Sequence, residues 1–196
     1  MTTTPSRLSK QARREQLLDT AITIVRTEGA DGLTLPTLSE AAGVSRPIVY
    51  DHFANRPSLL LALYQRLYEA HRAASAKALS EAANTLEDIA EVISAAYFAC
   101  AVDMPEFNAI SAALKGNPET EAIHHAMFDS YLDAMVAALR PHADLTTEAL
   151  RLRCVGLIGA AEAIGTELNL ERVTRDDAAA ALTDLIVRSL ATKTCE

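Results

Sequence analysis

Residues 34–53 read TLPTLSEAAGVSRPIVYDHF, and this stretch decides the fold of the 196-residue chain. The pattern predicts two short helices on either side of Gly43. A hydroxyl residue precedes each helix, Thr34 before the first and Ser45 before the second, and we expect each to cap its helix. A proline follows in the first turn of each, where it removes no helical hydrogen bond. Two capped helices joined at a glycine are typical of a helix-turn-helix, whose second helix can enter the DNA major groove. The alternative is ordinary packing of two short helices in a bundle.

The composition predicts an all-α protein. Hydrophobic residues make up 49% of the chain, aromatic residues 5%, and tryptophan is absent. No alternating run rich in Val, Ile or Tyr indicates a strand. We predict an N-terminal three-helix head over residues 1–62, with a first helix at 9–28 and the helix-turn-helix at 34–53. A larger α-helical domain is predicted over residues 63–196.

Charge is distributed unevenly along the chain. The net charge of −8 argues against a general nucleic-acid binder. Residues 1–66, however, hold eight Lys/Arg and six Asp/Glu, whereas residues 67–196 hold ten and twenty. The first fourteen residues contain four basic side chains and no acid, namely Arg7, Lys10, Arg13 and Arg14. This separation predicts a basic, DNA-facing end on an acidic protein. The basic segment taken alone is equally compatible with a solvated tail.

Missing features argue against several other classes. No apolar stretch is long enough to cross a membrane, and the polar N-terminus does not resemble a secretory signal, so we expect a cytoplasmic protein. The cysteines Cys100, Cys154 and Cys195 are far apart and without Cys-x-x-Cys spacing, which favours reduced thiols over a disulfide or a metal site. Adjacent His124 and His125 diverge by about 100° on a helix, so we expect no metal ion or other cofactor. No catalytic motif of the common hydrolase, nucleotide-binding or metalloprotease types is present, which argues against an enzyme.

The head resembles a known family. The matching pieces are Ala-Gly-Val-Ser at 42–45 and Tyr-x-His-Phe at 50–53, at the expected separation. Over residues 10–62 the chain is similar to the N-terminal signature of the TetR family of transcriptional regulators. Three positions depart from the family pattern: Arg56 stands where Lys is common, Pro57 where Glu or Asp is more frequent, and Pro47 where a small or polar residue is usual. The resemblance implies a DNA-binding regulator, with repression as the family default.

Two groups of head residues are predicted to contact DNA. By the resemblance, phosphate contacts would come from Thr34, Ser45, Tyr50, His52 and Arg56. Base contacts would come from Arg46 and Pro47, with Leu35 and Pro36 at the rim. An arginine in the first turn can bond both acceptors of guanine, and a proline can pack against a thymine methyl. Phosphate contacts position a protein, and base contacts specify the sequence. His52 has an alternative role as a helix-packing residue.

Residues 146–191 contain the best predicted dimer surface. Three glycines of one expected helix, Gly156, Gly159 and Gly165, each cost about 1 kcal/mol relative to alanine. We interpret these glycines as positions where a second helix approaches closely. The alternative is that the core of a single chain simply tolerates them. The resemblance implies dimerisation through the last two helices as a four-helix bundle, which fits a palindromic operator. The interface candidates are Gly156, Gly159, Ala160, Ala163, Leu182, Leu185 and Ile186.

Aromatic and methionine side chains between residues 97 and 135 form the predicted effector pocket. The candidates are Tyr97, Phe98, Met104, Phe107, Ile110, His124, Met127, Phe128, Tyr131 and Met135. Such a mixture suits an adaptable apolar cavity with a few polar groups, and a plain hydrophobic core is the alternative. We therefore predict a homodimeric DNA-binding regulator, most simply a repressor, that binds a palindromic operator and is released by a small, largely apolar effector. The alternative is a regulator or structural DNA-binding protein without a small-molecule ligand.

Overall fold

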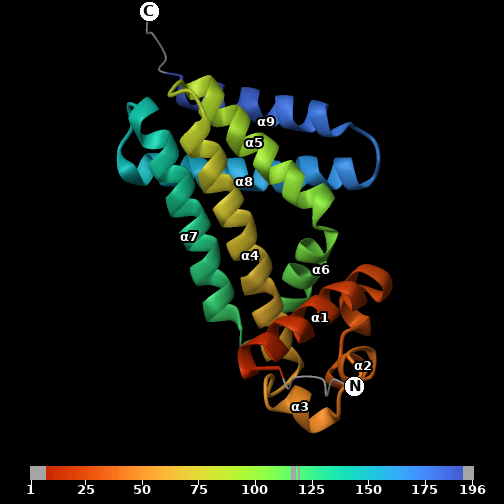
Figure 1. Ribbon diagram of the computed structural model, residues 1–196. Coiled ribbons are helices and arrows are strands. Elements are labelled where there is room, and N and C mark those ends of the chain that lie inside the picture. Colours follow the sequence, from red (N-terminus) through yellow and green to blue (C-terminus); the bar gives the residue numbers. More distant parts are fainter. Residues whose placement is uncertain (1–7, 116–117, 119, 192–196) are drawn as a thin grey trace, which may run out of the picture. The chain divides into compact units, whose positions relative to one another are not determined.

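The structure is a computed structural model that describes residues 8–115, 118 and 120–191. This part of the chain contains α-helices, one short 3-10 helix and no strand (Figure 1). The prediction of an all-α protein is therefore confirmed. Arg7, Cys195 and the side chain of His124 lie outside the described part. No helix within it is long and apolar enough to cross a membrane.

The chain forms two compact units. The first combines residues 1–67 with residues 105–122, and the second combines residues 68–104 with residues 123–196. The sequence had instead predicted a single boundary near residue 62. The difference arises because helix α6 (Pro105–Leu114) packs on α1 (Lys10–Gly32) and so belongs to the first unit.

The first unit contains the expected helix-turn-helix. Its elements are α1, α2 (Leu35–Ala41), α3 (Arg46–Tyr50), the first turns of α4 (Arg56–Glu81), and α6. Thr34 caps α2 as predicted: its Oγ1 accepts a hydrogen bond from Thr37 N at 3.2 Å, and Thr37 Oγ1 accepts one from Thr34 N at 2.9 Å. Gly29, expected to end the first helix, has a left-handed φ of 75° and kinks α1 there.

Apolar side chains from every helix of the first unit meet in its core. The most deeply buried are Leu17, Leu33, Leu38, Val49, Phe53, Leu59, Leu63, Ile110 and Leu114. Val49 of α3 and Phe53 just after it are 0% and 2% exposed. Because they anchor the short helix from one side, the opposite side of α3 is free to face outward.

One buried carboxylate joins α1 to α6 within the first unit. The Glu106 side chain is 0% exposed, and its Oε1 lies 2.7 Å from Arg26 Nη2. Its other oxygen, Oε2, is buried without a hydrogen-bond partner. A buried carboxylate is stable only when it is paired. Arg26 therefore holds the start of α6 on α1.

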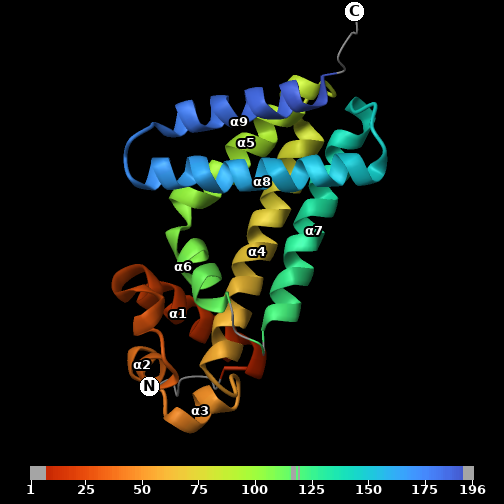
Figure 2. The ribbon, with the colours of Figure 1, turned by 180° about the vertical axis from the view of Figure 1, so that it is seen from behind.

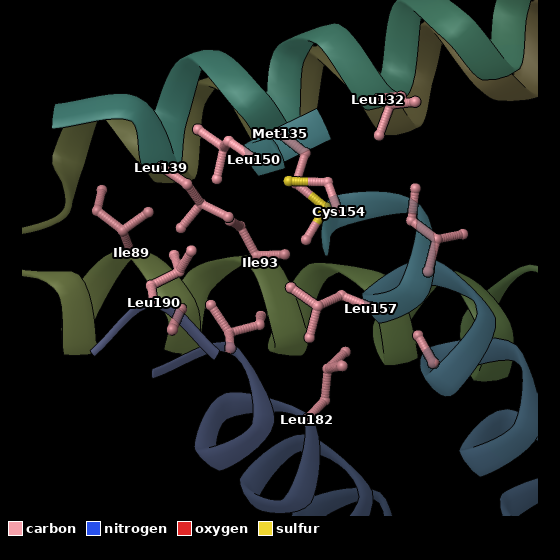
Figure 3. Packing of buried hydrophobic residues seen from close by; sticks show 14 of the residues in the cluster. Ile89, Ile93, Leu132, Met135, Leu139, Leu150, Cys154, Leu157, Leu182 and Leu190 are labelled. Atoms are coloured by element: carbon pink, nitrogen blue, oxygen red, sulfur yellow. The ribbon is translucent and has the colours of Figure 1, made fainter. Parts of the chain in front are cut away.

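The second unit is a bundle in which α8 and α9 lie side by side (Figure 2). Its remaining elements are the later turns of α4, α5 (Leu86–Asp103), most of α7 (Glu121–Leu139), a 3-10 turn at Arg140–His142, α8 (Thr147–Asn169) and α9 (Arg175–Leu190). Helix α5 packs against both α8 and α9. Figure 3 shows leucine, isoleucine, methionine and cysteine side chains from α5, α7, α8 and α9 pointing toward one another.

We predict that Arg26→Met lowers the free energy of unfolding by about 2 kcal/mol, because it leaves the Glu106 carboxylate buried and unpaired. The loss should fall below that of a fully buried pair, since the Arg26 side chain is 54% exposed. Urea unfolding followed by far-ultraviolet circular dichroism measures it. Arg72→Met is the matched control, because Arg72 and Glu69 are both more than half exposed, and it should cost no more than about 0.5 kcal/mol. Equal losses would show that Glu106 does not need its partner.

Candidate functional site

The exposed face of α3 is formed by residues near the start and end of that helix. Arg46, Pro47 and Tyr50 are exposed, with Tyr50 at 52%, whereas Val49 points into the core. Positions 46 and 50 are four apart and so lie on the same side of a helix. Within the described residues Arg46 has no hydrogen-bond or ion-pair partner, so its guanidinium is available to an external acceptor.

The two predicted caps of the helix-turn-helix differ. Thr34 is half-buried and uses its hydroxyl within the capping box of α2. Ser45 is exposed, and its hydroxyl makes no capping hydrogen bond to α3. Ser45 occupies the N-cap position of α3, as predicted, but without a side-chain capping hydrogen bond. The Ser45 hydroxyl is therefore not hydrogen-bonded to α3, whereas the Thr34 hydroxyl already takes part in the capping box of α2.

Positive charge collects beside the end of α3. Arg14 Nη1 donates to the His52 carbonyl oxygen at 3.1 Å, and the Arg14 guanidinium lies 4.8 Å from the centre of the Phe53 ring. Burial lowers the pKa of His52, and the charges of Lys10 and Arg14 lower it further. His52 is therefore neutral at pH 7, and the first turns of α1 bring cations close to it. The sequence showed these basic residues but not that Arg14 packs on Phe53.

Arg56 has a structural role in the first unit. Its Nε donates to the Leu33 carbonyl at 2.9 Å, and its Nη2 donates to the Ala30 carbonyl at 2.7 Å and to Asp31 at 3.4 Å. Ala30 and Asp31 lie in the last turn of α1 and Leu33 is its C-cap, so Arg56 ties the start of α4 to the end of α1, just before the helix-turn-helix. Arg56 is therefore not among the phosphate contacts that we propose.

Leu35 also differs from its predicted role. It is 4% exposed and belongs to the core of the first unit, so it presents no surface to a base. Its neighbour Pro36 is exposed. Of the nine predicted DNA contacts, the structure brings an exposed group of five together around the helix-turn-helix: Pro36, Ser45, Arg46, Pro47 and Tyr50. Thr34 and His52 are half-buried beside them.

The predicted effector pocket divides between the two units. Phe107 and Ile110 belong to the first unit, where the Phe107 ring stacks on that of Tyr64 at 4.7 Å. In the second unit Phe98 is fully buried, Met104 and Met127 are half-buried, and Phe128 is 37% exposed. Only Tyr97, Tyr131 and Met135 among the candidates line a cavity there.

That cavity is small. Its volume is about 10 Å³, and Ile93, Leu157 and Leu182 form part of its walls (Figure 3). This is close to the least space that holds one water molecule, whereas ligand pockets usually measure about 300–1,000 Å³. The core is therefore closed at these residues, and a ligand would have to open it there.

Most of the predicted interface residues are exposed on α8 and α9. Gly156, Gly159, Ala163 and Leu185 are exposed, and Ala160 is half-buried. A Cβ added at Gly156 or Gly159 would meet no atom within 4 Å. Leu182 and Ile186 are instead 2% and 0% exposed in the core of the second unit and offer no surface to a partner. Two apolar residues that the prediction had not included, Leu152 and Val155, are exposed next to the glycines at 73% and 41%.

The buried thiols and the metal-ligating side chains suggest no further chemistry. Cys100 and Cys154 are buried and form no disulfide within the described residues, and burial raises the pKa of Cys154 to about 11. Its thiol is therefore protonated and unreactive at neutral pH. Within the described residues, no group of three or more His, Cys, Asp or Glu side chains could hold a metal ion.

Comparison with known proteins assigns the first unit to a family. Residues 17–63 match the family model described as bacterial regulatory proteins, tetR family. Residues 17–63 of this chain therefore form a TetR-type N-terminal region. The matched segment runs from the middle of α1 into α4 and includes the whole helix-turn-helix.

Curated relatives match about a third of the chain. The transcriptional activator FasR of Mycolicibacterium smegmatis is 36% identical over 61 residues, which are 31% of this chain and 28% of FasR. The class D tetracycline repressor protein of Escherichia coli is 34% identical over 68 residues, which are 35% of this chain and 31% of the repressor. The chain therefore aligns with less than a third of either relative.

Solved structures extend the likeness over both units. A protein of unknown function from Rhodococcus sp. RHA1 has a TM-score of 0.77 at 23% identity, covering 97% of this chain and 100% of that one. FadR of Bacillus subtilis, solved in complex with stearoyl-CoA, has a TM-score of 0.73 at 18% identity, covering 90% and 99%. At these identities the likeness shows a shared fold.

We predict that Arg56→Met lowers the free energy of unfolding by about 2 kcal/mol, because it removes charge-assisted hydrogen bonds to two backbone carbonyls. Arg46→Met should change it by no more than about 0.5 kcal/mol, because Arg46 is exposed and makes no such bond. Urea titration of the two variants beside the parent protein measures both values. A larger loss for Arg46→Met than for Arg56→Met would reverse the roles assigned here.

Proposed function

We propose that this protein is a transcriptional regulator that binds a palindromic DNA operator as a homodimer and responds to a small effector. The observation that carries the proposal is the outward face of α3, where Arg46 has no partner within the described chain and lies next to exposed Pro47 and Tyr50. Arg46 would read a guanine, and Pro47 would contact a thymine methyl. Ser45 and Tyr50 would bind backbone phosphates, with Thr34, Pro36 and His52 at the edge of the contact.

The basic turn of α1 supplies the nonspecific part of binding. Lys10 is exposed and has no partner within the described chain, and its charge together with those of Arg13 and Arg14 acts on His52. Neutralising several phosphates makes affinity fall steeply with salt. The acidic second unit would keep other surfaces of the protein away from DNA.

Homodimerisation is proposed through α8 and α9. Exposed Leu152, Val155 and Leu185 surround Gly156 and Gly159, whose missing side chains leave room for another helix. Apolar residues around a glycine surface are suited to close helix packing between two copies. A two-fold dimer presents two copies of α3, which should lie about 34–36 Å apart or a multiple of that distance to read two half-sites.

Effector control is proposed for the second unit. FadR of Bacillus subtilis, which shares the fold, was solved with stearoyl-CoA, and this favours a ligand in the family fold. Helix α4 would carry the signal, because residues of one continuous helix belong to both units. The ligand must bind one state of α4 better than another to change DNA affinity. The closed core favours a second candidate, a regulator without an effector, whose test is the absence of any ligand-induced change in DNA affinity.

Repression is proposed as the mode of action. FasR is named an activator and the tetracycline protein a repressor, and each is about equally similar to this chain over about a third of its length. This similarity therefore does not set the direction of regulation. A dimer on its operator blocks other proteins from the same DNA without any further contact, so repression requires the fewest additional features.

We predict that Arg46→Ala relaxes base preference at one position of each half-site and costs about 1–3 kcal/mol at the preferred operator. Tyr50→Phe should weaken all sequences about equally, because it removes a phosphate contact. Selection of DNA from a random pool, followed by binding measurements with the parent protein and both variants, checks this. The assignment fails if neither change affects the selected sequence or its affinity.

We predict that Gly159→Leu leaves the protein folded but monomeric, because a Cβ at this exposed position meets no atom of its own chain within 4 Å and the longer side chain would block a second helix. Ala126→Leu, at an exposed position of α7, is the control and should remain dimeric. Sedimentation equilibrium gives the mass of each variant, and circular dichroism confirms folding. A dimeric Gly159→Leu protein would place the interface elsewhere.

A further inference from the structure

Uncharged polar side chains lie on α4, α5 and α7 in the second unit, and two of them, Tyr97 and Tyr131, pack against its apolar core. We call this set the polar seam, and its members are Tyr68, His71 and Ser75 of α4, Ser94 and Tyr97 of α5, and Tyr131 of α7. The three α4 residues are spaced i, i+3 and i+7, and so share one helix face. The ring centroids of His71 and Tyr131 are 6.3 Å apart, and Tyr131 interacts electrostatically with both Tyr68 and Tyr97.

Three hydroxyls of the polar seam are buried without a partner. Tyr68 is 6% exposed, Ser94 is 0% exposed, and neither hydroxyl makes a hydrogen bond within the described chain. The Ser75 hydroxyl is also buried and unpartnered. Buried hydroxyls are nearly always hydrogen-bonded, because an unmade bond is costly in an apolar core. Several such donors in one core are better explained by an external acceptor than by packing.

The polar seam has no ionised group of its own at neutral pH. It contains no Asp, Glu, Lys or Arg. Burial lowers the pKa of His71, and burial raises the pKa of Tyr131 to about 12. Burial, with a smaller contribution from the charge of Glu162, also raises the pKa of Tyr97. Glu162 itself is exposed on α8 rather than part of the core.

The polar seam meets the small cavity at Tyr97 and Tyr131. The other walls of that cavity are apolar and include Ile93, Leu157 and Leu182. Met135 also lines it, and its flexible side chain can move to enlarge the space. A molecule that opens the core here would meet apolar walls on one side and hydroxyl donors on the other.

We propose that the polar seam binds an uncharged, largely apolar small molecule whose oxygen atoms accept hydrogen bonds, such as a ketone, an ester or a lactone. This inference rests on the proposed function, in which that molecule is the effector. An anion would lose its hydration without meeting a cation in the core, and an ammonium ion would meet no carboxylate inside it. A neutral acceptor meets neither penalty and pairs the free donors.

Three probes of equal chain length test the ligand class: 2-octanone, octanoate and octylammonium. Calorimetric titration into the full-length dimer gives the affinities, and tyrosine fluorescence reports binding within the core. The chain has no tryptophan, and three of its five tyrosines belong to the polar seam. We expect 2-octanone to bind about ten-fold or more tightly than either ion. Equal or tighter binding of an ion, or no binding of 2-octanone up to its solubility limit, overturns the proposal.

Tyr68→Phe separates a ligand-binding role from a purely structural one. Because this change removes an unpartnered buried hydroxyl, it should raise the melting temperature of the free protein and weaken 2-octanone binding about five-fold. Tyr64→Phe is the matched control in the first unit and should leave ketone affinity unchanged. A lower melting temperature with unchanged ketone affinity for Tyr68→Phe would overturn the role of this hydroxyl.

DNA selection separates failure of this inference from failure of the proposed function. If the protein selects a defined DNA sequence but binds octanoate most tightly, the proposed ligand class is wrong and the proposed regulatory function is unaffected. If the protein selects no DNA sequence, the proposed regulatory function is wrong, whether or not 2-octanone binds. Release of the selected DNA by 2-octanone, with no release by octanoate at the same concentration, supports both.

Discussion

One continuous helix supplies side chains to both hydrophobic cores, and this constraint underlies the rest of the structure. The first turns of α4 place Leu59 and Leu63 in the core of the first unit, and its later turns pack Leu79 against the core of the second and carry buried Tyr68 and half-buried His71. Its first residue, Arg56, is hydrogen-bonded to Ala30 in the last turn of α1 and to the C-cap Leu33. A shift of α4 along or about its axis therefore acts at both ends. In the proposed mechanism, a ligand that moves Tyr68 and His71 changes the support of the helix-turn-helix without touching it.

Much of this arrangement could be predicted from sequence where local chemistry determines it. Hydroxyl, proline and glycine spacing identified α2 and α3, since capping and turn formation depend on neighbouring residues. The two caps nevertheless differ: Thr37 supplies a second hydroxyl that completes the box at Thr34, while Ser45 has no such partner bond. The exposure of Arg46 and the burial of Val49 follow from helical spacing once Phe53 anchors the turn.

The remaining features depend on contacts between residues distant in sequence. Arg46 and Arg56 are equivalent by residue type, and only the carbonyls of Ala30 and Leu33 make one of them structural. The sequence offered Phe107 and Ile110 of α6 as pocket candidates and Leu182 and Leu185 of α9 as interface candidates, but the residue types alone do not say what covers them. The ion pair between Arg26 and Glu106 joins α6 to α1. Because α6 therefore belongs to the first unit, the residues predicted for the pocket are divided between the two units. For the same reason, the apolar stripe of α9 contains both buried Leu182 and exposed Leu185.

A closed core and unpartnered donors together favour regulation by a weakly populated open state. Opening the second unit exposes apolar walls to solvent, which limits how often the open state forms without ligand. Each hydrogen bond that the polar seam fails to make, however, destabilises the closed state. The free-energy difference between the closed and open states is therefore smaller. A ligand that pairs those hydroxyls gains stabilisation only in the open state, which is the differential affinity that a population shift requires. Filling the polar seam with apolar side chains would stabilise the protein and remove this difference. The uncharged hydrogen-bond donors that distinguish the two states therefore lie on α4, the same helix that supports the DNA-facing end.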